Sequence, residues 1–265
     1  ALVAIALSLA RPSRTERVPR ERATVVLAID VSISMEATDV EPNRLDAARA
    51  AATTFTEVLP PEFNLGLVSF AGTATVAVSP TTDREAVTDA IPGLELSEST
   101  AIGEAVLASL GSIDAMARRS GLEAGSDAAT EEADEPEVPA SIVVMSDGET
   151  TVGTPNEIAA ADAKEAGVPV TTIGFGTDEG TITYEGEVVP VPVNEEELAQ
   201  LAETTGGNAF VAATGDELQS AYEDIGSLVG YETEQREIGR WFVGAAFALM
   251  LLSSVASLAW FSRLP

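Results

Sequence analysis

Three oxygen-bearing side chains stand at alternate positions directly after a short apolar run. Residues 24–29 are apolar or β-branched, which is typical of a strand buried on both faces of a parallel sheet. The run ends at Asp30, and Ser32 and Ser34 follow it. A carboxylate and two hydroxyls at the end of a buried strand can bind a hard divalent cation, because Mg²⁺ and Mn²⁺ prefer oxygen ligands. An ordinary serine-rich turn is the alternative, so further ligands must come from elsewhere in the chain.

Two further oxygen donors lie at places where a sheet would bring them near the first three. Asp147 follows a second apolar run, residues 141–146. Thr100 ends a polar stretch, just before apolar residues recur at helical spacing. Doubly wound sheets bind ligands at the carboxyl ends of strands, near the reversal of strand order. A simple turn also explains Asp147, and a helix cap explains Thr100, but together they complete a predicted metal site: Asp30, Ser32, Ser34, Thr100 and Asp147.

The composition excludes several kinds of chemistry. The chain has 265 residues with no Cys and no His. Disulfides, thiolate metal sites, His-bound zinc and His-dependent catalytic triads are therefore impossible. The formal charge is −29, from 43 acidic and 14 basic residues. This balance argues against nucleic acid as a partner, because binding phosphates requires clustered Lys and Arg.

The central part of the chain alternates between strand and helix patterns. Two strands around Gly72 are predicted to form a hairpin, and apolar runs predict further strands at residues 141–146, 168–174 and 208–212. Capping residues mark four predicted helix starts: Asn43, Thr154 with Pro155 and Glu157, Asn194 with Glu197, and Thr214 with Glu217. A further short helix is predicted over residues 83–91. The alternation predicts an α/β fold, a doubly wound and mostly parallel sheet with helices on both faces.

Two insertions interrupt this alternation. Residues 120–140 contain seven acids and no base, which is typical of a mobile acidic loop. Residues 181–193 alternate around Glu185 and Gly186, and are predicted to form a small hairpin. Either insertion could be a docking element or simply a solvated surface feature.

Both ends of the chain are apolar and are predicted to lie in a membrane. Residues 241–261 contain no charge and would extend about 31 Å as a helix, enough to span a bilayer. Residues 1–10 are expected to be the trimmed end of another span, with residues 11–22 as a basic juxtamembrane linker. A folded domain over residues 23–230 and a connector over residues 231–240 complete the predicted organisation.

The five predicted ligands resemble the metal-ion-dependent adhesion site (MIDAS) of von Willebrand factor A domains. That site combines D-x-S-x-S, a Thr before a mid-chain helix and an Asp after a core strand, in the order found here. The resemblance covers residues 23–230 and implies a Rossmann-like fold. It also implies that Ser32 and Ser34 bind the metal directly, whereas Asp30, Thr100 and Asp147 bind directly or through water.

The chemistry of such a site favours binding over catalysis. Two carboxylates and three neutral hydroxyls leave a divalent cation short of negative charge, so an open coordination position attracts an Asp or Glu from a partner protein. Mg²⁺ is the expected ion, with Mn²⁺ or Ca²⁺ as alternatives. Hydrolysis needs a positioned base and an acid for the leaving group, and the sequence presents no such pair. We therefore expect a binding module and no enzyme, with a metal-dependent hydrolase as a remote alternative.

A narrower resemblance is to the Bat, or aerotolerance-type, bacterial membrane proteins. The stretches that carry it are residues 30–35, 37–45, 66–72, 100–105 and 172–177. Bat proteins place a von Willebrand A domain between membrane helices and are associated with MoxR-type AAA+ ATPases. The resemblance implies a protein of the bacterial plasma membrane with a role in envelope stress or complex assembly. Its partners would be a MoxR-type ATPase and related membrane proteins; a cell-surface adhesin using the same metal site is the alternative.

The side of the membrane on which the domain lies is left open by the sequence. Five Arg occur in residues 11–22, whereas only Arg263 follows the last apolar segment. The positive-inside rule applied to these residues favours a cytoplasmic domain. A more basic loop upstream of residue 1 would reverse this orientation.

Overall fold

The computed structural model describes residues 13–19, 22–123, 139–229 and 231–237, together with Phe247 and Leu251. They belong to two compact units: one contains the two terminal strands, and the other lies between residues 20 and 230. The predicted membrane segments (residues 1–10 and, apart from Phe247 and Leu251, 241–261) and most of the acidic insertion lie outside the described residues. Within the described ranges, no helix has both the length and the apolar character needed to cross a bilayer.

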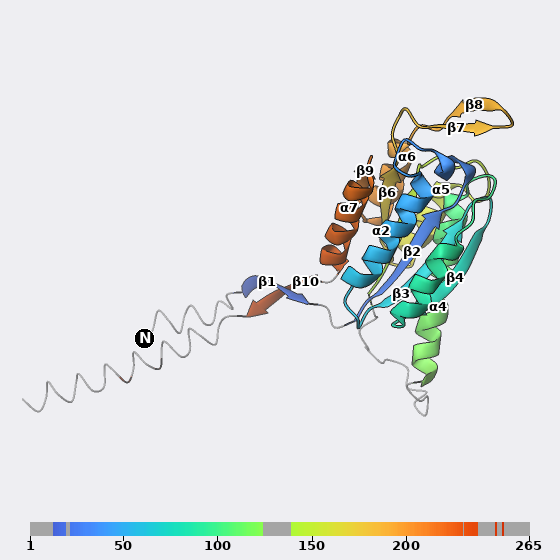
Figure 1. Ribbon diagram of the computed structural model, residues 1–265. Coiled ribbons are helices and arrows are strands. Elements are labelled where there is room, and N and C mark those ends of the chain that lie inside the picture. Colours follow the sequence, from blue (N-terminus) through green and yellow to red (C-terminus); the bar gives the residue numbers. More distant parts are fainter. Residues whose placement is uncertain are drawn as a thin grey trace, which may run out of the picture. The chain divides into compact units, whose positions relative to one another are not determined.

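The larger unit is built on a six-stranded sheet in the order β4-β3-β2-β5-β6-β9 (Figure 1). Neighbouring strands are parallel except β3 and β4, which form the predicted antiparallel hairpin. The mostly parallel α/β sheet expected from the sequence is therefore confirmed. The strand bounds are β2 Thr24–Asp30, β3 Asn64–Phe70, β4 Ala74–Thr81, β5 Ala140–Ser146, β6 Val170–Phe175 and β9 Ala209–Ala212.

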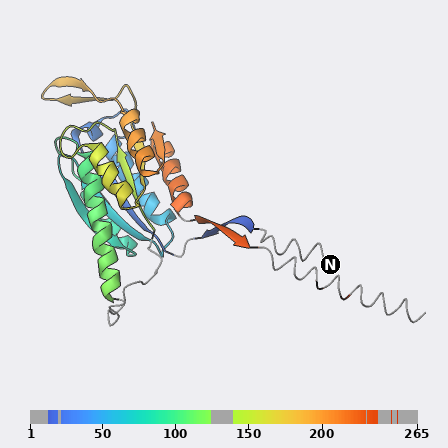
Figure 2. The same cartoon turned by 180° about the vertical axis from the view of Figure 1, so that it is seen from behind.

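Helices cover both faces of this sheet (Figures 1 and 2). Successive residues of a strand point to opposite faces, so Val25 and Leu27 join one apolar core and Val26 and Ala28 join the other. The first core is closed by α2 (Arg44–Val58), α3 (Arg84–Ala90) and α7 (Gly215–Val229). The second core is closed by α4 (Ile102–Glu123), α5 (Asn156–Glu165) and α6 (Glu195–Thr205).

The strand order reverses at β2, which lies between β3 and β5. The helix that follows β2 covers one face, and the helix that follows β5 covers the other. Such a reversal opens a crevice at the carboxyl ends of the two central strands, where ligands bind in doubly wound sheets. Asp30 is the last residue of β2, and Asp147 directly follows β5. The topology therefore brings the two predicted carboxylates to one place.

Most of the predicted helix caps form as expected, because a side-chain oxygen accepts an amide proton that the helix leaves unpaired. Asn43 accepts from the amide of Asp46 at 2.8 Å, at the start of α2. At the start of α7, Thr214 accepts from the amide of Glu217 at 3.2 Å, while Glu217 accepts from the amide of Ala213 at 2.8 Å.

The predicted cap of α5 is wrong. Pro155 occupies the N-cap position and α5 begins at Asn156. Thr154 does not cap the helix, because its hydroxyl donates to Glu104 Oε1 at 2.7 Å. Glu104 lies on α4, so a contact between distant segments overrides the local capping signal.

Two glycines of α4 allow a test of how closely this helix packs. A Cβ at Gly103 would overlap the backbone carbonyl of Thr154, whereas a Cβ at Gly111 would have no neighbour within 4 Å. We expect Gly103→Ala to destabilise the fold by about 1–3 kcal/mol, because backbone atoms would have to move. Gly111→Ala should stabilise it by about 0.5–1 kcal/mol, because alanine is the better helix former. Urea denaturation of both variants measures the difference, and equal effects would contradict the packing.

The smaller unit replaces predicted linkers with a two-stranded sheet. β1 (Ser13–Pro19) pairs antiparallel with β10 (Tyr231–Glu237), with Ser13 opposite Glu237 and Pro19 opposite Tyr231. Residues 11–22 and 231–240 were expected to be a basic linker and a connector, and within these stretches the structure forms the strands β1 and β10. The pairing joins segments from opposite ends of the chain, so neither local sequence predicts it.

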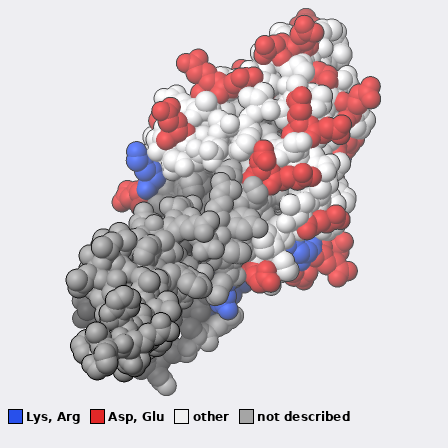
Figure 3. All heavy atoms as spheres, turned by 90° about the vertical axis from the view of Figure 1, so that its left-hand side faces the viewer, with Lys and Arg blue, Asp and Glu red and all other residues white. Residues whose placement is uncertain are grey.

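The acidic composition is visible on the molecular surface. On the face shown in Figure 3, Asp and Glu side chains are spread over the described surface and Lys and Arg side chains are few.

Candidate metal centre

Asp30 is fixed at the crevice by hydrogen bonds to the loop that follows it and to the end of β5. Its side chain is fully buried. Oδ1 accepts from the amide of Ser32 at 2.7 Å, and Oδ2 accepts from the hydroxyl of Ser146 at 2.5 Å. Because Ser146 ends β5, Asp30 links the ends of the two central strands. Each of its carboxylate oxygens keeps a further lone pair for a cation or a water molecule.

Ser32 and Ser34 present their hydroxyls side by side. The two Oγ atoms are 2.9 Å apart. The short 3-10 helix η1 (Ile33–Glu36) brings them together, with its turn closed by the amide of Met35 donating to Ser32 O at 3.0 Å. Met35 is buried in the core and anchors this turn. The alternate spacing read from the sequence therefore places both hydroxyls at one point.

Asp147 leaves one buried carboxylate oxygen without a partner. Only 2% of the residue is exposed. Its Oδ2 lies 3.4 Å from Arg44 Nη1, whereas Oδ1 has no hydrogen-bond partner. The hydroxyl of Ser34 and the amide of Glu149 lie close enough to lower the pKa of Asp147, but neither makes a hydrogen bond to Oδ1, and the Ser34 hydroxyl is paired with Ser32. A buried polar atom without a partner is costly, which indicates that another group completes the site.

The two buried carboxylates are electrostatically unfavourable without a cation. Burial and the neighbouring Asp147 raise the pKa of Asp30 to about 7, against hydrogen bonds from Ser146 and Ser32 that lower it. Burial also raises the pKa of Asp147, against the lowering effects of Ser34 and Arg44. A divalent cation would favour the charged form of both groups. A hard divalent cation therefore fits this site, because it would bind the unpartnered oxygen and the paired hydroxyls and would stabilise the two buried carboxylates in their charged form.

Thr100 lies on the neighbouring loop. The amide of Ser97 donates to Val31 O at 2.8 Å, and Ser97 forms a parallel bridge with Ser32, so this loop runs beside the one that carries the serines. The Thr100 amide donates to Thr151 Oγ1 at 2.8 Å, which fixes the start of α4. Within the described residues, the Thr100 hydroxyl forms no hydrogen bond with the other four predicted ligands. Hydrogen bonds thus join Asp30 to Ser32 and Ser32 to Ser34, and Asp147 lies near Ser34. Thr100 lies on the next loop.

The raised pKa of Asp30 predicts how stability depends on pH in a chelator. In the folded chain the pKa of Asp30 is raised to about 7 and that of its neighbour Asp147 is also raised, so the pair holds on to protons that the unfolded chain loses near the ordinary value of 3.8. The free energy of unfolding should therefore fall as pH rises from about 4 to about 7, by roughly 2–4 kcal/mol. Asp39 and Asp46, whose pKa values are lowered, act in the opposite sense but below this window.

Urea denaturation between pH 4 and pH 8 in EDTA measures this dependence. Asp30→Asn is the matched variant, because it keeps the shape of the side chain and removes its titration. We expect a flatter pH profile for Asp30→Asn, and excess Mg²⁺ to stabilise the unchanged chain above pH 7. A stability that rises between pH 4 and pH 7 in EDTA would contradict the electrostatics of the site.

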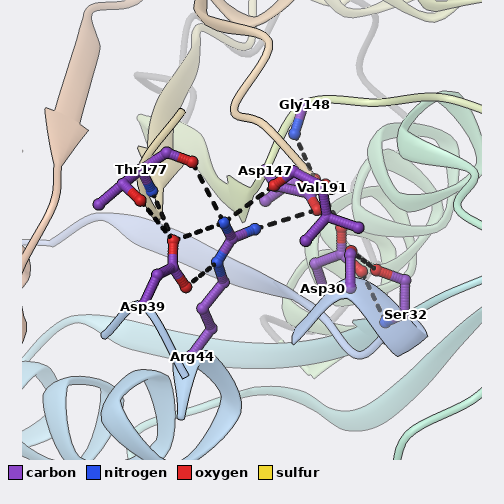
Figure 4. Close-up of polar contacts among 10 residues, drawn as sticks. Asp30, Ser32, Asp39, Arg44, Asp147, Gly148, Thr177 and Val191 are labelled. Carbon is purple, nitrogen blue, oxygen red and sulfur yellow. Dashed lines mark hydrogen bonds and ion pairs between the residues drawn. The ribbon is translucent and has the colours of Figure 1, made fainter. Parts of the chain in front are cut away.

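Arg44 was not predicted from the sequence as part of the site, yet it joins several groups on one side of it (Figure 4). Arg44 is fully buried. Its Nε and Nη2 donate to the two oxygens of Asp39 at 2.8 and 2.7 Å, and its Nη1 lies 3.4 Å from Asp147 Oδ2. Nη2 also donates to the carbonyls of Val191 and Thr177, at 2.9 and 3.4 Å.

One signal in the sequence could have identified Arg44. It is the first residue of α2, directly after the N-cap Asn43. The N-terminus of a helix carries a partial positive charge and favours acidic residues. A basic residue at that position is therefore unfavourable unless an acid elsewhere in the fold pairs with it. Asp39 and Asp147 are those acids.

Comparison with known proteins agrees with this fold. Residues 25–149 match the von Willebrand factor type A domain family. The UPF0353 protein of Mycobacterium marinum is 40% identical over 270 residues, an alignment that covers 100% of this chain and 77% of the relative. The resemblance to von Willebrand A domains that the metal motif carries is confirmed.

Solved structures share the same fold. BatB from Bacteroides thetaiotaomicron is 26% identical with a TM-score of 0.60, and the match covers 78% of this chain and 98% of BatB. An aerotolerance-related membrane protein from Bacteroides fragilis is 24% identical with a TM-score of 0.61, over 78% of this chain and 99% of that one. Proximal thread matrix protein 1 of the mussel byssus, with zinc in its MIDAS motif, is 19% identical with a TM-score of 0.56, over 89% of this chain and 52% of its own. The chain contains a von Willebrand factor type A domain and belongs to the UPF0353 family.

Proposed function

We propose that this domain binds a partner protein through a divalent cation at the carboxyl ends of β2 and β5. The observation that carries the proposal is the buried Oδ1 of Asp147, which has no hydrogen-bond partner. Asp147 lies near Ser34, whose hydroxyl is paired with that of Ser32. Neutral hydroxyls and two carboxylates leave a bound cation with net positive charge. The ligand that completes it is then a carboxylate, from an Asp or Glu on the partner.

The residues of the chain have distinct roles in this proposal. Ser32 and Ser34 hold the cation through their hydroxyls, and Asp147 offers its free oxygen. Asp30 orients the loop through the Ser32 amide and binds directly or through water, as does Thr100. A set of oxygen donors alone favours Mg²⁺, Mn²⁺ or Ca²⁺. The zinc in the mussel protein supports a metal at this motif. The all-oxygen donor set is the reason to propose a hard cation here, and Mg²⁺ is the first ion to test.

We further propose that the domain is anchored in the bacterial plasma membrane and works with a MoxR-type AAA+ ATPase. Residues 241–261 carry no charge and are long enough to span a bilayer. The relation to BatB and to an aerotolerance-related membrane protein supports the same setting. The Bat resemblance implies a role in complex assembly or envelope stress. In this role the metal site is the surface that binds the partner.

Capture of the partner with and without metal tests this proposal. The full chain is immobilised and exposed to detergent extracts of its own bacterium in Mg²⁺ or in EDTA, with mass spectrometry of what is retained. We expect a partner that is retained in Mg²⁺, released by EDTA and lost in Asp30→Ala. Asp162→Ala is the matched control, because Asp162 is an exposed acid on α5. Equal capture in Mg²⁺ and EDTA, or undiminished capture by Asp30→Ala, would refute metal-dependent binding.

A further inference from the structure

The β7–β8 hairpin is closed at its base by backbone hydrogen bonds. β7 (Thr181–Tyr184) and β8 (Glu187–Pro190) pair antiparallel, as the sequence predicted. Below the strands, the amide of Gly180 donates to Thr177 O at 3.3 Å, and the amide of Val191 donates to Gly180 O at 2.8 Å. The two ends of the hairpin therefore meet at Thr177, Gly180 and Val191, which we call the hairpin base.

Arg44 and Asp39 bind this base from below. Arg44 Nη2 donates to the carbonyls of Thr177 and Val191, one at each end of the hairpin. Asp39 Oδ2 accepts from both the amide and the hydroxyl of Thr177, at 2.8 and 2.9 Å. A Cβ at Gly180 would overlap the guanidinium of Arg44, so the backbone at the base closes directly on the arginine.

The same guanidinium reaches the metal site. Arg44 Nη1 lies 3.4 Å from Asp147 Oδ2, and Oδ1 of the same carboxylate is the oxygen without a partner. Arg44 therefore determines which oxygen of Asp147 is left for a cation. The positive charge of Arg44 is offset by its paired contacts with Asp39, so a second cation can approach. A planar fork of donors can bridge these groups at once, and a lysine ammonium cannot.

A second contact joins the hairpin to the loops of the site. The hydroxyl of Tyr184 donates to Glu98 Oε1 at 3.4 Å, and Glu98 lies two residues before Thr100. β7 also packs near η1, the turn that carries Ser34. The outer side chains of the hairpin remain open, with Val188 70% exposed. The hairpin is thus linked to the site at its base and along β7, and its outer side chains are exposed. Figure 1 shows the β7–β8 hairpin projecting from one end of the domain.

We propose that Arg44 is a positioning residue that couples the metal site to the β7–β8 hairpin. Arg44 contacts Asp147 Oδ2 and both ends of the hairpin base at once. A change in the orientation of the Asp147 carboxylate therefore changes how firmly the hairpin base is held, and the reverse is also true. A cation bound at Asp147 fixes that carboxylate, and through Arg44 it reduces the opening of the hairpin base. This inference rests on the proposed metal site and assigns the hairpin as the part of the binding surface that responds to metal.

Arg44→Lys tests the coupling, because it retains the charge and removes the fork. Mn²⁺ affinity of the full chain is measured by isothermal titration, and hydrogen exchange of residues 177–191 is measured by mass spectrometry in Mn²⁺ and in EDTA. We expect Mn²⁺ to slow exchange at the hairpin base in the unchanged chain. In Arg44→Lys we expect binding to weaken by about 10- to 100-fold and the exchange difference at saturating Mn²⁺ to shrink.

Asp39→Asn is the second variant, because it leaves Arg44 in place and removes the charge that anchors it. It should lose affinity and the exchange difference in the same way, so the test holds even if Arg44→Lys does not fold. Arg49→Lys is the matched control: Arg49 also lies on α2, but it pairs with Asp46 and contacts Leu94. It should leave both readouts unchanged.

The outcomes separate this inference from the proposed function. If the unchanged chain binds no Mn²⁺, the metal site itself is wrong. If the unchanged chain binds Mn²⁺ but folded Arg44→Lys and Asp39→Asn retain its affinity within about twofold and its full exchange difference, the positioning role of Arg44 is refuted and the metal site stands. An affinity that increases in Arg44→Lys would also overturn the inference, because it would mean that Arg44 opposes the cation.

Discussion

Replacing Asp30 by alanine is expected to weaken Mg²⁺ binding by at least about 100-fold, because it removes a carboxylate at the centre of an oxygen-donor site. It also removes the acceptor for the Ser32 amide and the Ser146 hydroxyl, which hold the two loops together. Isothermal titration of the full chain at pH 8, above the raised pKa of Asp30, measures the loss.

Asp162→Ala serves as the control for this experiment, since it removes an exposed acid from α5 and lowers the net negative charge equally. We expect its Mg²⁺ affinity to equal that of the unchanged chain. A loss of similar size in both variants would mean that the acidic surface attracts the ion non-specifically. An Asp30→Ala chain that binds as tightly as the unchanged one would place the metal elsewhere.

Replacing Arg44 by methionine is expected to destabilise the fold by about 3–5 kcal/mol, which is typical of breaking a buried ion pair. The substitution leaves Asp39 and Asp147 without their cation, and only 10% and 3% of these side chains are exposed. It also removes the hydrogen bonds that Arg44 donates to two carbonyls at the hairpin base, those of Thr177 and Val191. Urea denaturation at pH 7 in EDTA measures the change in the free energy of unfolding.

Arg49→Met is the matched comparison, because the Arg49–Asp46 ion pair has 28% and 44% exposed side chains. Exposed pairs contribute little, so we expect a cost within about 1 kcal/mol. Equal costs for Arg44→Met and Arg49→Met would contradict the account of Arg44 as a buried charge held by two acids. It would also remove the energetic basis for the link between the site and the hairpin.

The parts of the fold that local sequence predicted are those set by local physics. Buried strands appear as apolar runs, and their ends are visible as the first polar residues, which is how Asp30 and Asp147 could be placed. Caps such as Asn43 and Thr214 depend on hydrogen bonds within four residues. The turn of the β7–β8 hairpin has positive φ angles at Glu185 and Gly186, as a two-residue hairpin turn requires; Gly186 adopts such an angle readily, whereas Glu185 does not favour it.

The features that were missed depend on contacts between distant segments. Thr154 has the sequence of a helix cap, but Glu104 on another helix takes its hydroxyl. Pairing of β1 with β10 joins the two ends of the chain. Arg44 meets Asp147 across more than a hundred residues, and only its unfavourable position at a helix N-terminus hints at such a partner.

The central claim is that the donors on the loops after β2 and β5 hold one cation at the reversal of strand order. Crystals of the domain grown in Mn²⁺ and measured for anomalous scattering test this most directly. The account predicts one strong peak at Ser32, Ser34 and Asp147, which is absent from Asp30→Ala crystals grown in the same way. A crystal of the unchanged chain with no peak at these residues, or with its strongest peak on another surface, would contradict it.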